Sequence, residues 1–447
     1  MVRALVFTAM KRAILMSLAA LTLAACGGPP PAADQGYGPN PELPAPEKGG
    51  PIPTLEVAEA VGWADGAGPA APEGFTVARY AEDLAHPRWL YVLPNGDVLV
   101  AESSTLPRRG GGIEGWVANR LQRRGGALAP SANRITLLRD GDGDGDVDAR
   151  HVFAENLNQP FGMALVGEYF YVGNTDAVVR FRYAPGAVRV TGEAETVLEL
   201  PHRENNGHWT RSLAVSPGGT KLYVAVGSAT NIADDGMEAE EGRAAIWEFN
   251  PDGSEARIYA SGLRNPVGLE FEPHTGVLWT AVNERDMLGD NLVPDYMTSV
   301  RDGAFYGWPY YYYGDHRDDR VEIPANVRLQ SPTAPDYALG AHTASLGLHF
   351  YGADQLPERY WNGAFIGQHG SWNRRAPAGY KVIYVPFAEG RPSGEVQDFL
   401  TGFLNARGQA QGRPVGVTTD RTGALLVADD VGDIVWRVSY DESAAPQ

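Results

Sequence analysis

The sequence predicts an all-β fold, a six-bladed β-propeller whose blades are four-stranded antiparallel sheets. One observation is a pattern that recurs six times: a proline or small residue, a short apolar strand, a turn with glycine, and a second strand rich in β-branched and aromatic residues. Another is composition, because 54 glycines and 33 prolines among 447 residues favour short strands joined by turns. Long helical periodicity is nearly absent.

The six copies of the pattern cover most of the chain. They lie at 86–103, 159–181, 210–228, 265–284, 345–372 and 413–438. Several continue into a third apolar strand, as at 134–138, 245–249 and 381–385. Repeats of this kind bury their apolar faces against their neighbours, so we expect a ring of blades rather than the alternative, a pair of β-sandwiches.

The N-terminal residues predict export. An apolar run at 13–25 follows two basic residues and ends at Cys26, which is typical of a secretory signal spanning 1–25. The residues Leu23-Ala24-Ala25-Cys26 resemble a bacterial lipobox, which implies cleavage before Cys26 and lipidation of its thiol. The alternative is an ordinary signal peptide cut near the same place. We therefore expect a periplasmic protein that meets a membrane, with the outer membrane favoured, through a lipid anchor alone.

The next residues, 26–71, are rich in proline, glycine and alanine, and we expect them to form an extended tether. The propeller is expected at 72–441, followed by a tail at 442–447. A net charge of −18 argues against nucleic acid or an anionic membrane surface as partner. The single cysteine excludes a disulfide framework.

Three long inserts, at 104–133, 229–243 and 285–343, are expected at the end of the propeller that holds the functional site. The first contains a predicted helix at 112–124 and a local basic patch, which is either a solvated face or a counter-charge for an anionic cofactor. The patch comprises Arg108, Arg109, Arg120, Arg123, Arg124 and Arg134. The third contains aromatic residues at 306–313, which are either a carbohydrate-binding surface or core packing under a long loop.

An aspartate run predicts a calcium loop. Asp140, Asp142, Asp144, Asp146 and Asp148 alternate with small residues, and such a loop can wrap carboxylates around one Ca²⁺. Gly145 falls where an EF-hand loop turns sharply, but position twelve is His151 instead of a bidentate glutamate. The alternative is a solvated acidic turn.

Three further groups of polar residues could carry chemistry. His208 precedes a strand and is our candidate general base, with a structural hydrogen-bonding role as the alternative. Arg264 and Asn265 could grip a carboxylate, or could serve only a blade-edge turn. The run at 367–375, with Lys381 close behind, would suit an acidic ligand at the axis.

These residues resemble the glucose/sorbosone dehydrogenase family, soluble sugar dehydrogenases that use pyrroloquinoline quinone (PQQ), and most closely its sorbosone-dehydrogenase-like branch. The resemblance covers roughly 75–440. It rests on the combination of GHWTRSLAVSPGG, GLRNPVGLEF, NERDMLGDNLVPDY, FYGWP, IGQHGSWNRR, GYKV, GRPVGV and VADD.

The resemblance implies oxidation of an aldose or sugar aldehyde to the lactone or acid. His208 would remove the hydroxyl proton while hydride passes to the quinone. It also implies that Arg264 and Asn265 contact PQQ, that Arg374 and Lys381 reach its carboxylates, and that Gln159 or, alternatively, Asn158 lies near it. No Cys-x-x-Cys-His motif is present, so a separate electron acceptor, a cytochrome or a quinone, is expected.

One segment departs from the family. The glucose enzymes hold Ca²⁺ partly through backbone oxygens of a Gln-Gly-Pro segment, where this chain has Asn283-Glu284-Arg285-Asp286. We therefore expect side chains to hold the metal, with Glu284 as the candidate. Two other readings stay open: a propeller lactonase or hydrolase whose axial Ca²⁺ polarises an ester, and a non-catalytic propeller that binds glycans or a protein.

Overall fold

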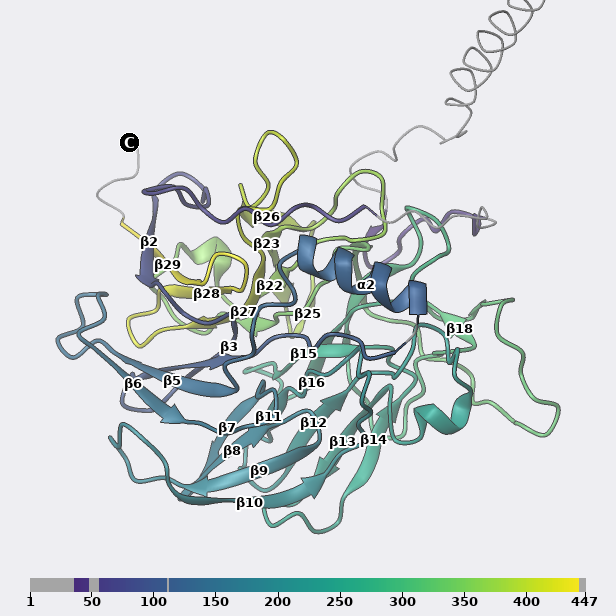
Figure 1. The fold of residues 1–447 in the computed structure, drawn as a ribbon, viewed down its shortest axis with the longest axis horizontal. Helices are drawn as coiled ribbons and strands as arrows, with labels where there is room; N and C mark the ends of the chain where they lie inside the picture. The colour runs from purple at the N-terminus through teal and green to yellow at the C-terminus, as the bar shows by residue number, and fades with distance from the viewer. Residues whose placement is uncertain (1–35, 48–55, 111, 442–447) are drawn as a thin grey trace, which may run out of the picture. The chain divides into compact units, whose positions relative to one another are not determined.

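A computed structural model describes residues 36–47, 56–110 and 112–441, and its sheets form the six blades of a β-propeller (Figure 1). The fold prediction is therefore confirmed. The signal segment 1–25, Cys26 and the tail 442–447 lie outside the described residues. Within the described part of the chain, no helix has both the length and the apolarity needed to cross a membrane.

The first three blades follow one another along the chain. Blade 1 comprises β3 (Pro87–Val92), β4 (Val98–Glu102), β5 (Arg134–Arg139) and β6 (Ala149–Ala154). Blade 2 comprises β7 (Met163–Val166), β8 (Tyr169–Gly173), β9 (Ala177–Arg182) and β10 (Thr191–Glu199). Blade 3 comprises β11 (Leu213–Val215), β12 (Leu222–Val226), β13 (Ala245–Phe249) and β14 (Arg257–Ser261).

The last three blades complete the ring. Blade 4 comprises β15 (Pro266–Phe271), β16 (Leu278–Val282), β17 (Pro294–Ser299) and β20 (Tyr337–Ala341), with β1 (Tyr37–Gly38) added at its edge. Blade 5 comprises β21 (His349–Phe350), β22 (Ala364–Gln368), β23 (Lys381–Val385) and β26 (Gln397–Leu400). Blade 6 comprises β27 (Pro414–Thr419), β28 (Leu425–Asp429), β29 (Ile434–Tyr440) and β2 (Phe75–Ala81).

Short elements lie between these strands. They are the hairpins β18 (Tyr311–Tyr312) with β19 (His316–Arg317) and β24 (Phe387–Ala388) with β25 (Arg391–Pro392), the helix α2 (Gly112–Arg124), and the 3₁₀ turns η1 (Met237–Glu240) and η2 (Glu358–Tyr360). The sequence predicted α2 with these bounds. The third insert also supplies β17 and β20, so part of it belongs to blade 4 itself.

The ring closes because β2, from the start of the domain, pairs antiparallel with β29 from its end. Each blade contributes its first strand to a central cavity of about 360 Å³, lined by residues of β3, β7, β11, β15, β21 and β27 or their immediate neighbours. All six strands begin at the same end of the ring, which we call the upper end. Apolar side chains fill the space between adjacent sheets and form the core.

Glycines allow the first strands to meet at the axis. A Cβ on Gly162 would lie 2.3 Å from the backbone nitrogen of Leu213 in the next blade, and one on Gly347 would lie 2.0 Å from the carbonyl oxygen of Val415. Both glycines therefore serve close backbone approach. These two glycines occupy the small-residue position ahead of the first strand, and not the glycine turn of the sequence pattern.

The described part of the expected tether packs on the propeller, which corrects the boundary at residue 72. Val57 and Ala58 are buried, and the Trp63 indole Nε1 donates to Asp429 Oδ2 at 2.7 Å. The Trp63 ring also contacts Trp436 edge-to-face, with centroids 5.4 Å apart. Low-complexity composition concealed these contacts because their partners lie near the opposite end of the chain.

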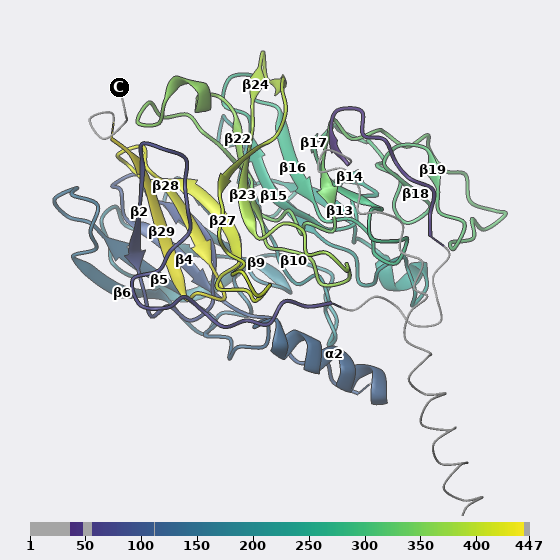
Figure 2. The ribbon, with the colours of Figure 1, turned by 90° about the horizontal axis from the view of Figure 1, so that it is seen from above.

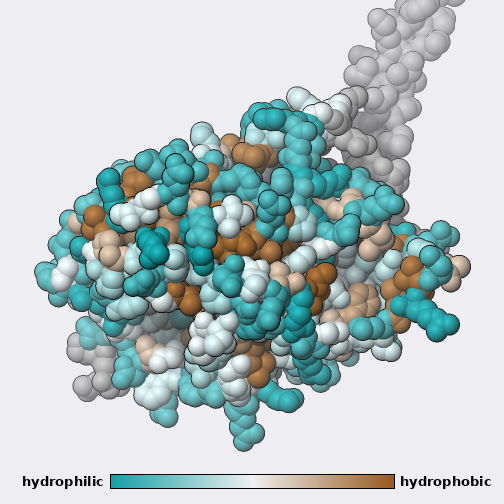
Figure 3. Space-filling view, turned by 90° about the horizontal axis from the view of Figure 1, so that it is seen from below, coloured by the Kyte–Doolittle hydropathy of each residue, from teal (hydrophilic) through white to brown (hydrophobic). Residues whose placement is uncertain are grey.

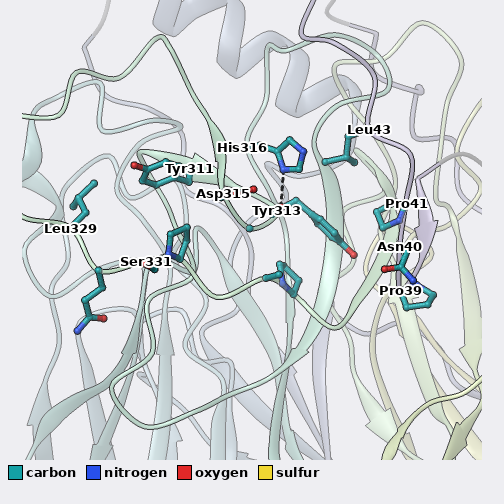
Figure 4. Close-up of a pocket in the computed structure, with 15 residues that line it drawn as sticks. Pro39, Asn40, Pro41, Leu43, Tyr311, Tyr313, Asp315, His316, Leu329 and Ser331 are labelled. Atoms are coloured by element: carbon teal, nitrogen blue, oxygen red, sulfur yellow. Dashed lines mark hydrogen bonds between the residues drawn. The ribbon is translucent and has the colours of Figure 1, made fainter.

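The aromatic run mostly serves core packing. Tyr306, Trp308, Tyr310 and Tyr312 are all buried. Tyr311 and Tyr313 line a cavity of about 730 Å³ between β18–β19 and the segment 39–43 (Figure 4). The two interpretations of the aromatic residues were a carbohydrate-binding surface and core packing. The structure favours core packing under a loop for most of these side chains.

The surface is mainly hydrophilic on the side shown in Figure 3, where hydrophobic residues occur in separate patches. This surface agrees with the net charge of −18.

Candidate functional site

His208 lies at the upper end of blade 3, in the loop that precedes β11. Its Nδ1 is 2.9 Å from the carbonyl oxygen of Ser228, the residue that follows the strand β12 and its Gly227. A carbonyl oxygen only accepts, so Nδ1 carries the proton and Nε2 keeps its lone pair. Burial, helped by the Arg264 guanidinium, lowers the pKa of His208 to about 3. The half-buried imidazole is therefore neutral near pH 7 and can accept a proton at Nε2.

Arg264, at the start of blade 4, is buried beside His208. Its Nη2 donates to Asp286 Oδ2 at 3.1 Å and to Asn231 Oδ1 at 2.9 Å, while Nη1 donates to the Glu284 carbonyl oxygen at 2.6 Å. Asp286 is thus a negative charge close enough to act on both the Arg264 guanidinium and the His208 imidazole. Burial alone would raise the pKa of Asp286, but Arg264 and His342 outweigh burial and lower it.

Asp286 also joins blade 4 to blade 5. Its Oδ1 accepts from Asn373 Nδ2 at 2.9 Å and lies 3.4 Å from His342 Nδ1, whose partner Nε2 is 2.8 Å from the Gly289 carbonyl oxygen. Both His342 nitrogens face acceptors, an arrangement that favours the protonated ring. Burial opposes this charge, but the contact with Asp286 raises the pKa of His342.

A second cluster lies on blades 5, 6 and 1; the run 367–375 drew attention to His369, but its pairing with the other members was not predicted. Asp430 Oδ2 accepts from Arg88 Nη1 and from His369 Nε2 at 2.8 Å, and lies 3.4 Å from His86 Nε2. Burial raises the pKa of Asp430, but His369, His86 and Arg88 together hold it well below its ordinary value. Burial lowers the pKa of His369 to about 4.

The first cluster, which comprises His208, Arg264 and Asp286 with their partners, and the second cluster around Asp430 face the same end of the axis. The Arg88 guanidinium carbon lies 5.5 Å from the ring centroid of Trp209, the residue next to His208. Arg413, at the start of β27, accepts on its carbonyl oxygen from the Asp430 backbone nitrogen at 3.3 Å. The polar residues at the ends of β22 and β28 were visible in the sequence. Their contact with each other could not be predicted, because it depends on how the propeller arranges the blades.

Two other expected site residues are held by protein atoms. Gln159 is buried at the start of blade 2, and its Nε2 donates to the Ser104 carbonyl oxygen at 2.8 Å. Arg374 donates from Nη2 to Asn291 Oδ1 at 3.2 Å and from Nη1 to the Ala341 carbonyl oxygen at 3.3 Å. Burial lowers the pKa of Arg374.

Lys381 and Glu284 take part in other contacts. Lys381 begins β23, the third strand of its blade, and pairs with Asp398 at 2.5 Å. The Glu284 carboxylate is buried and accepts from the backbone nitrogen and Nε of Arg285, at 3.0 and 3.1 Å. The structure therefore brings neither side chain into the two clusters. The Glu284 carboxylate pairs with the neighbouring guanidinium instead of facing an open metal site.

The aspartate loop lies at the opposite end of blade 1 from the upper end. It joins β5 to β6, beside the β3–β4 turn, where Arg139 Nη2 is 2.6 Å from Asp97 Oδ2. Asp140, Asp142 and Asp148 each place one oxygen within 4.8 Å of the others, which would suit one cation. Asp144 and Asp146 lie outside this group, and Asp144 Oδ1 accepts from the Asp146 backbone nitrogen at 2.9 Å.

The residues of the upper end fit an anionic ligand such as a quinone tricarboxylate. Buried guanidinium groups gather there, on Arg88, Arg264 and Arg413. Several buried polar atoms have no hydrogen-bond partner within the described residues: Asn265 Oδ1, Asn373 Oδ1, Asp430 Oδ1, and the Nε atoms of Arg88, Arg374 and Arg413. Such atoms are costly unless a ligand or water pairs with them.

Comparison with known proteins identifies a family and several proteins that are similar to this chain. The model of the TrAA12-like family matches residues 69–298 and 326–440. An uncharacterized protein of Borreliella burgdorferi is 29% identical over 65% of this chain and 78% of its own length. The aldose sugar dehydrogenase YliI of Escherichia coli is 25% identical over 67% of this chain and 79% of its own length. A PQQ-dependent pyranose dehydrogenase of Coprinopsis cinerea is 25% identical over 70% of this chain, but the match spans 44% of that enzyme.

Solved structures share the fold. The holo form of the PQQ domain of the Coprinopsis cinerea pyranose dehydrogenase superposes with a TM-score of 0.65 at 22% identity, covering 83% of this chain and 97% of that one. A calcium structure of a Trichoderma reesei family AA12 carbohydrate-active enzyme gives a TM-score of 0.67 at 19% identity, covering 87% and 99%.

Proposed function

Because the chain belongs to the TrAA12-like family, we propose that it is a PQQ-dependent oxidoreductase that oxidises an aldose or sugar aldehyde to the lactone or acid. Its relatives in Escherichia coli and Coprinopsis cinerea are a sugar dehydrogenase and a PQQ-dependent pyranose dehydrogenase. The observation that carries the proposal is a neutral, oriented imidazole, His208, beside the buried guanidinium of Arg264.

The proposed reaction begins with proton removal by His208. A sugar hydroxyl donates its proton to Nε2, while the Ser228 carbonyl oxygen keeps Nδ1–H in place. The charge of Arg264 destabilises the imidazolium that forms, and the charge of Asp286 stabilises it. Because burial and Arg264 together dominate, the imidazolium releases the proton readily, and the proton passes to solvent. PQQ, when bound, supplies the acceptor for the hydride that leaves the sugar carbon.

Arg264 and Asn265 would hold the cofactor, together with Arg374. The second cluster adds Arg88, His369 and Arg413 to this set, since they border the same end of the axis and the Nε atoms of Arg88 and Arg413 have no hydrogen-bond partner among the described residues. Lys381 and Glu284 have other partners, so Lys381 is not assigned to the cofactor and Glu284 is not assigned to the metal. We place Ca²⁺ at Asp140, Asp142 and Asp148, where it would stabilise the lower turn of blade 1.

The remaining expectations complete the proposal. Lipidation at Cys26 would tether the protein in the periplasm to the membrane, with the outer membrane favoured. Electrons would leave through a separate acceptor, a cytochrome or a quinone, since no haem-attachment motif occurs in the sequence.

The test is reduction of a dye by an aldose after loading with PQQ and Ca²⁺. We expect His208→Gln to lower kcat by about 10²–10⁴-fold, because it removes the base. His202→Gln, an exposed histidine in the same loop, is the matched control and should retain activity. Lactone hydrolysis without PQQ would instead support a lactonase, and sugar binding indifferent to PQQ a non-catalytic propeller.

A further inference from the structure

The helix α2 lies between β4 and β5 at the upper end of the propeller, and Figure 2 shows it apart from the sheets, at the lower edge of that view. The residues before it are joined to the loop that carries His208. The Arg109 backbone nitrogen donates to Asn205 Oδ1 at 2.8 Å, and Asn205 Nδ2 returns a bond to the Arg109 carbonyl oxygen at 3.0 Å. Trp209 Nε1 donates to Thr105 Oγ1 at 3.0 Å.

The C-terminal end of α2 is fixed on the other side of the site. The Ala60 backbone nitrogen donates to the Arg124 carbonyl oxygen at 2.8 Å. A Cβ on Gly125, just past the helix, would lie 3.3 Å from Nη2 of Arg413. The helix therefore runs between the His208 loop and the start of blade 6, and borders the mouth of the candidate site.

The outer surface of α2 is basic and carries an exposed indole. Trp116 is 62% exposed, and the Arg120 guanidinium carbon lies 5.8 Å from its ring centroid. A depression of about 560 Å³ is lined by Glu59, Trp116, Arg120, Leu121, Arg123 and Arg124. Within the described residues, Arg120, Arg123 and Arg124 have no ion-pair partner, whereas Arg109 pairs with Glu204 and Arg134 with Glu102.

Folding explains only part of this surface. Arg123 and Arg124 occupy the last turn, where cations favour the helix dipole. The exposure of Trp116 and the position of Arg120 in the middle of the helix have no such cause. Tryptophan and arginine dominate the energetics of protein interfaces, and three guanidinium groups against one carboxylate, that of Glu59, make this depression basic on a chain of net charge −18.

We propose that the α2 surface, defined by Trp116, Arg120, Arg123 and Arg124, docks the acidic face of a redox protein that accepts electrons. The proposal rests on the proposed function. Each sugar oxidised to its lactone gives up two electrons and two protons, so two molecules of a one-electron acceptor are reduced and the protons pass to solvent. An acidic partner would be steered to this patch and repelled by the rest of the surface.

The charge pattern favours a protein over a lipid surface. One exposed indole and a half-buried Leu121 offer too little apolar area for an interfacial helix. A second copy of this chain is also acidic, so self-association at the patch is an outcome that the binding test below separates from docking of a redox protein.

The kinetic test uses the full chain loaded with PQQ, an acidic c-type cytochrome as electron acceptor and a basic c-type cytochrome for comparison. At low ionic strength we expect Arg120→Gln/Arg123→Gln/Arg124→Gln to slow reduction of the acidic cytochrome at least about tenfold and to flatten its salt dependence. The corresponding Lys triple should restore the rate. Reduction of a small neutral dye should stay unchanged.

The control removes equal charge elsewhere. Arg328, Arg391 and Arg407 are exposed and outside the patch, so their Gln triple should leave the rate with the acidic cytochrome near that of the wild type. A similar loss in the control triple, or equal rates with both cytochromes in the wild type, would overturn the docking surface.

A binding measurement separates this proposal from the proposed function. Affinity of the cofactor-free chain for the oxidised acidic cytochrome should fall in the Gln triple and in Trp116→Ala, whatever the sugar activity. If the patch residues instead govern binding to vesicles of phosphatidylglycerol, or self-association, the redox-partner proposal is wrong.

Discussion

Nδ1 of His208 lies 2.9 Å from the carbonyl oxygen of Ser228, and this contact fixes which nitrogen of the imidazole can act as a base. The backbone acceptor cannot be lost by side-chain substitution. Burial and Arg264 then keep the ring neutral, with its pKa lowered to about 3. The strand end of blade 3 and the guanidinium of blade 4 therefore support the proposed acid-base role of His208.

The lowered pKa of His208 predicts a pH-dependent stability. The unfolded chain binds a proton at this histidine near pH 6.5, whereas the folded chain does not, so its contribution is present above pH 6.5 and is lost as pH falls toward 3. Between pH 7.5 and 5.5 the free energy of unfolding should fall by about 1.4 kcal/mol more in the wild type than in His208→Gln. Denaturant titrations at both pH values measure this difference. An equal change in the free energy of unfolding in the two proteins would contradict a neutral, half-buried ring.

Asp286→Asn should leave the Arg264 guanidinium buried without its counter-charge. Breaking a buried pair from one side costs about 3 kcal/mol, so we expect that loss in the free energy of unfolding of the cofactor-free protein. An anionic ligand should recover more stability in this variant than in the wild type. Asp302→Asn, which breaks an exposed pair with Arg257, is the control and should change little.

Calcium should stabilise the protein through the lower turn of blade 1. At a concentration one hundred times its Kd, Ca²⁺ adds about 2.7 kcal/mol, measured as a rise in Tm that EGTA reverses. Asp142→Asn should abolish the rise, because Asp142 belongs to the carboxylate group. Asp146→Asn should preserve it, and an equal loss in both variants would indicate a general acidic effect.

Trp63→Ala tests whether the N-terminal segment is part of the propeller. The variant loses an indole hydrogen bond to Asp429 and edge contacts with Trp436 and Phe403, so we expect a loss of about 2–4 kcal/mol. Trp116→Ala removes an exposed indole and should leave the free energy of unfolding nearly unchanged. Similar unfolding curves for Trp63→Ala and the wild type would restore the tether interpretation.

The blades were predictable because their signals are local. Proline at the start of β15 and glycine within it mark where that strand begins and where backbones meet, and six copies of the broader strand–turn–strand pattern predict a ring. The bounds of α2 were equally visible. The sequence also drew attention to His208, Arg264 and Asn265, which the structure gathers at one end.

The second cluster and the packing of the N-terminal segment could not be predicted, because they depend on contacts between residues far apart in the sequence. Asp430 meets Arg88 across 342 positions, and Trp63 meets Asp429 across 366, so neither pairing leaves a local pattern. Lys381 faces Asp398 because it begins a third strand, a placement that motif spacing does not reveal. Glu284 and Arg285 are neighbours in sequence, and their pairing could have been suspected before the structure.

Single-turnover absorbance spectroscopy tests the central claim most directly. PQQ is titrated onto the wild type and His208→Gln, and an aldose is then added without an external acceptor. We predict saturable PQQ binding by both proteins and rapid bleaching of the oxidised quinone by the wild type alone. Absence of binding, or equal bleaching in His208→Gln, would contradict the account.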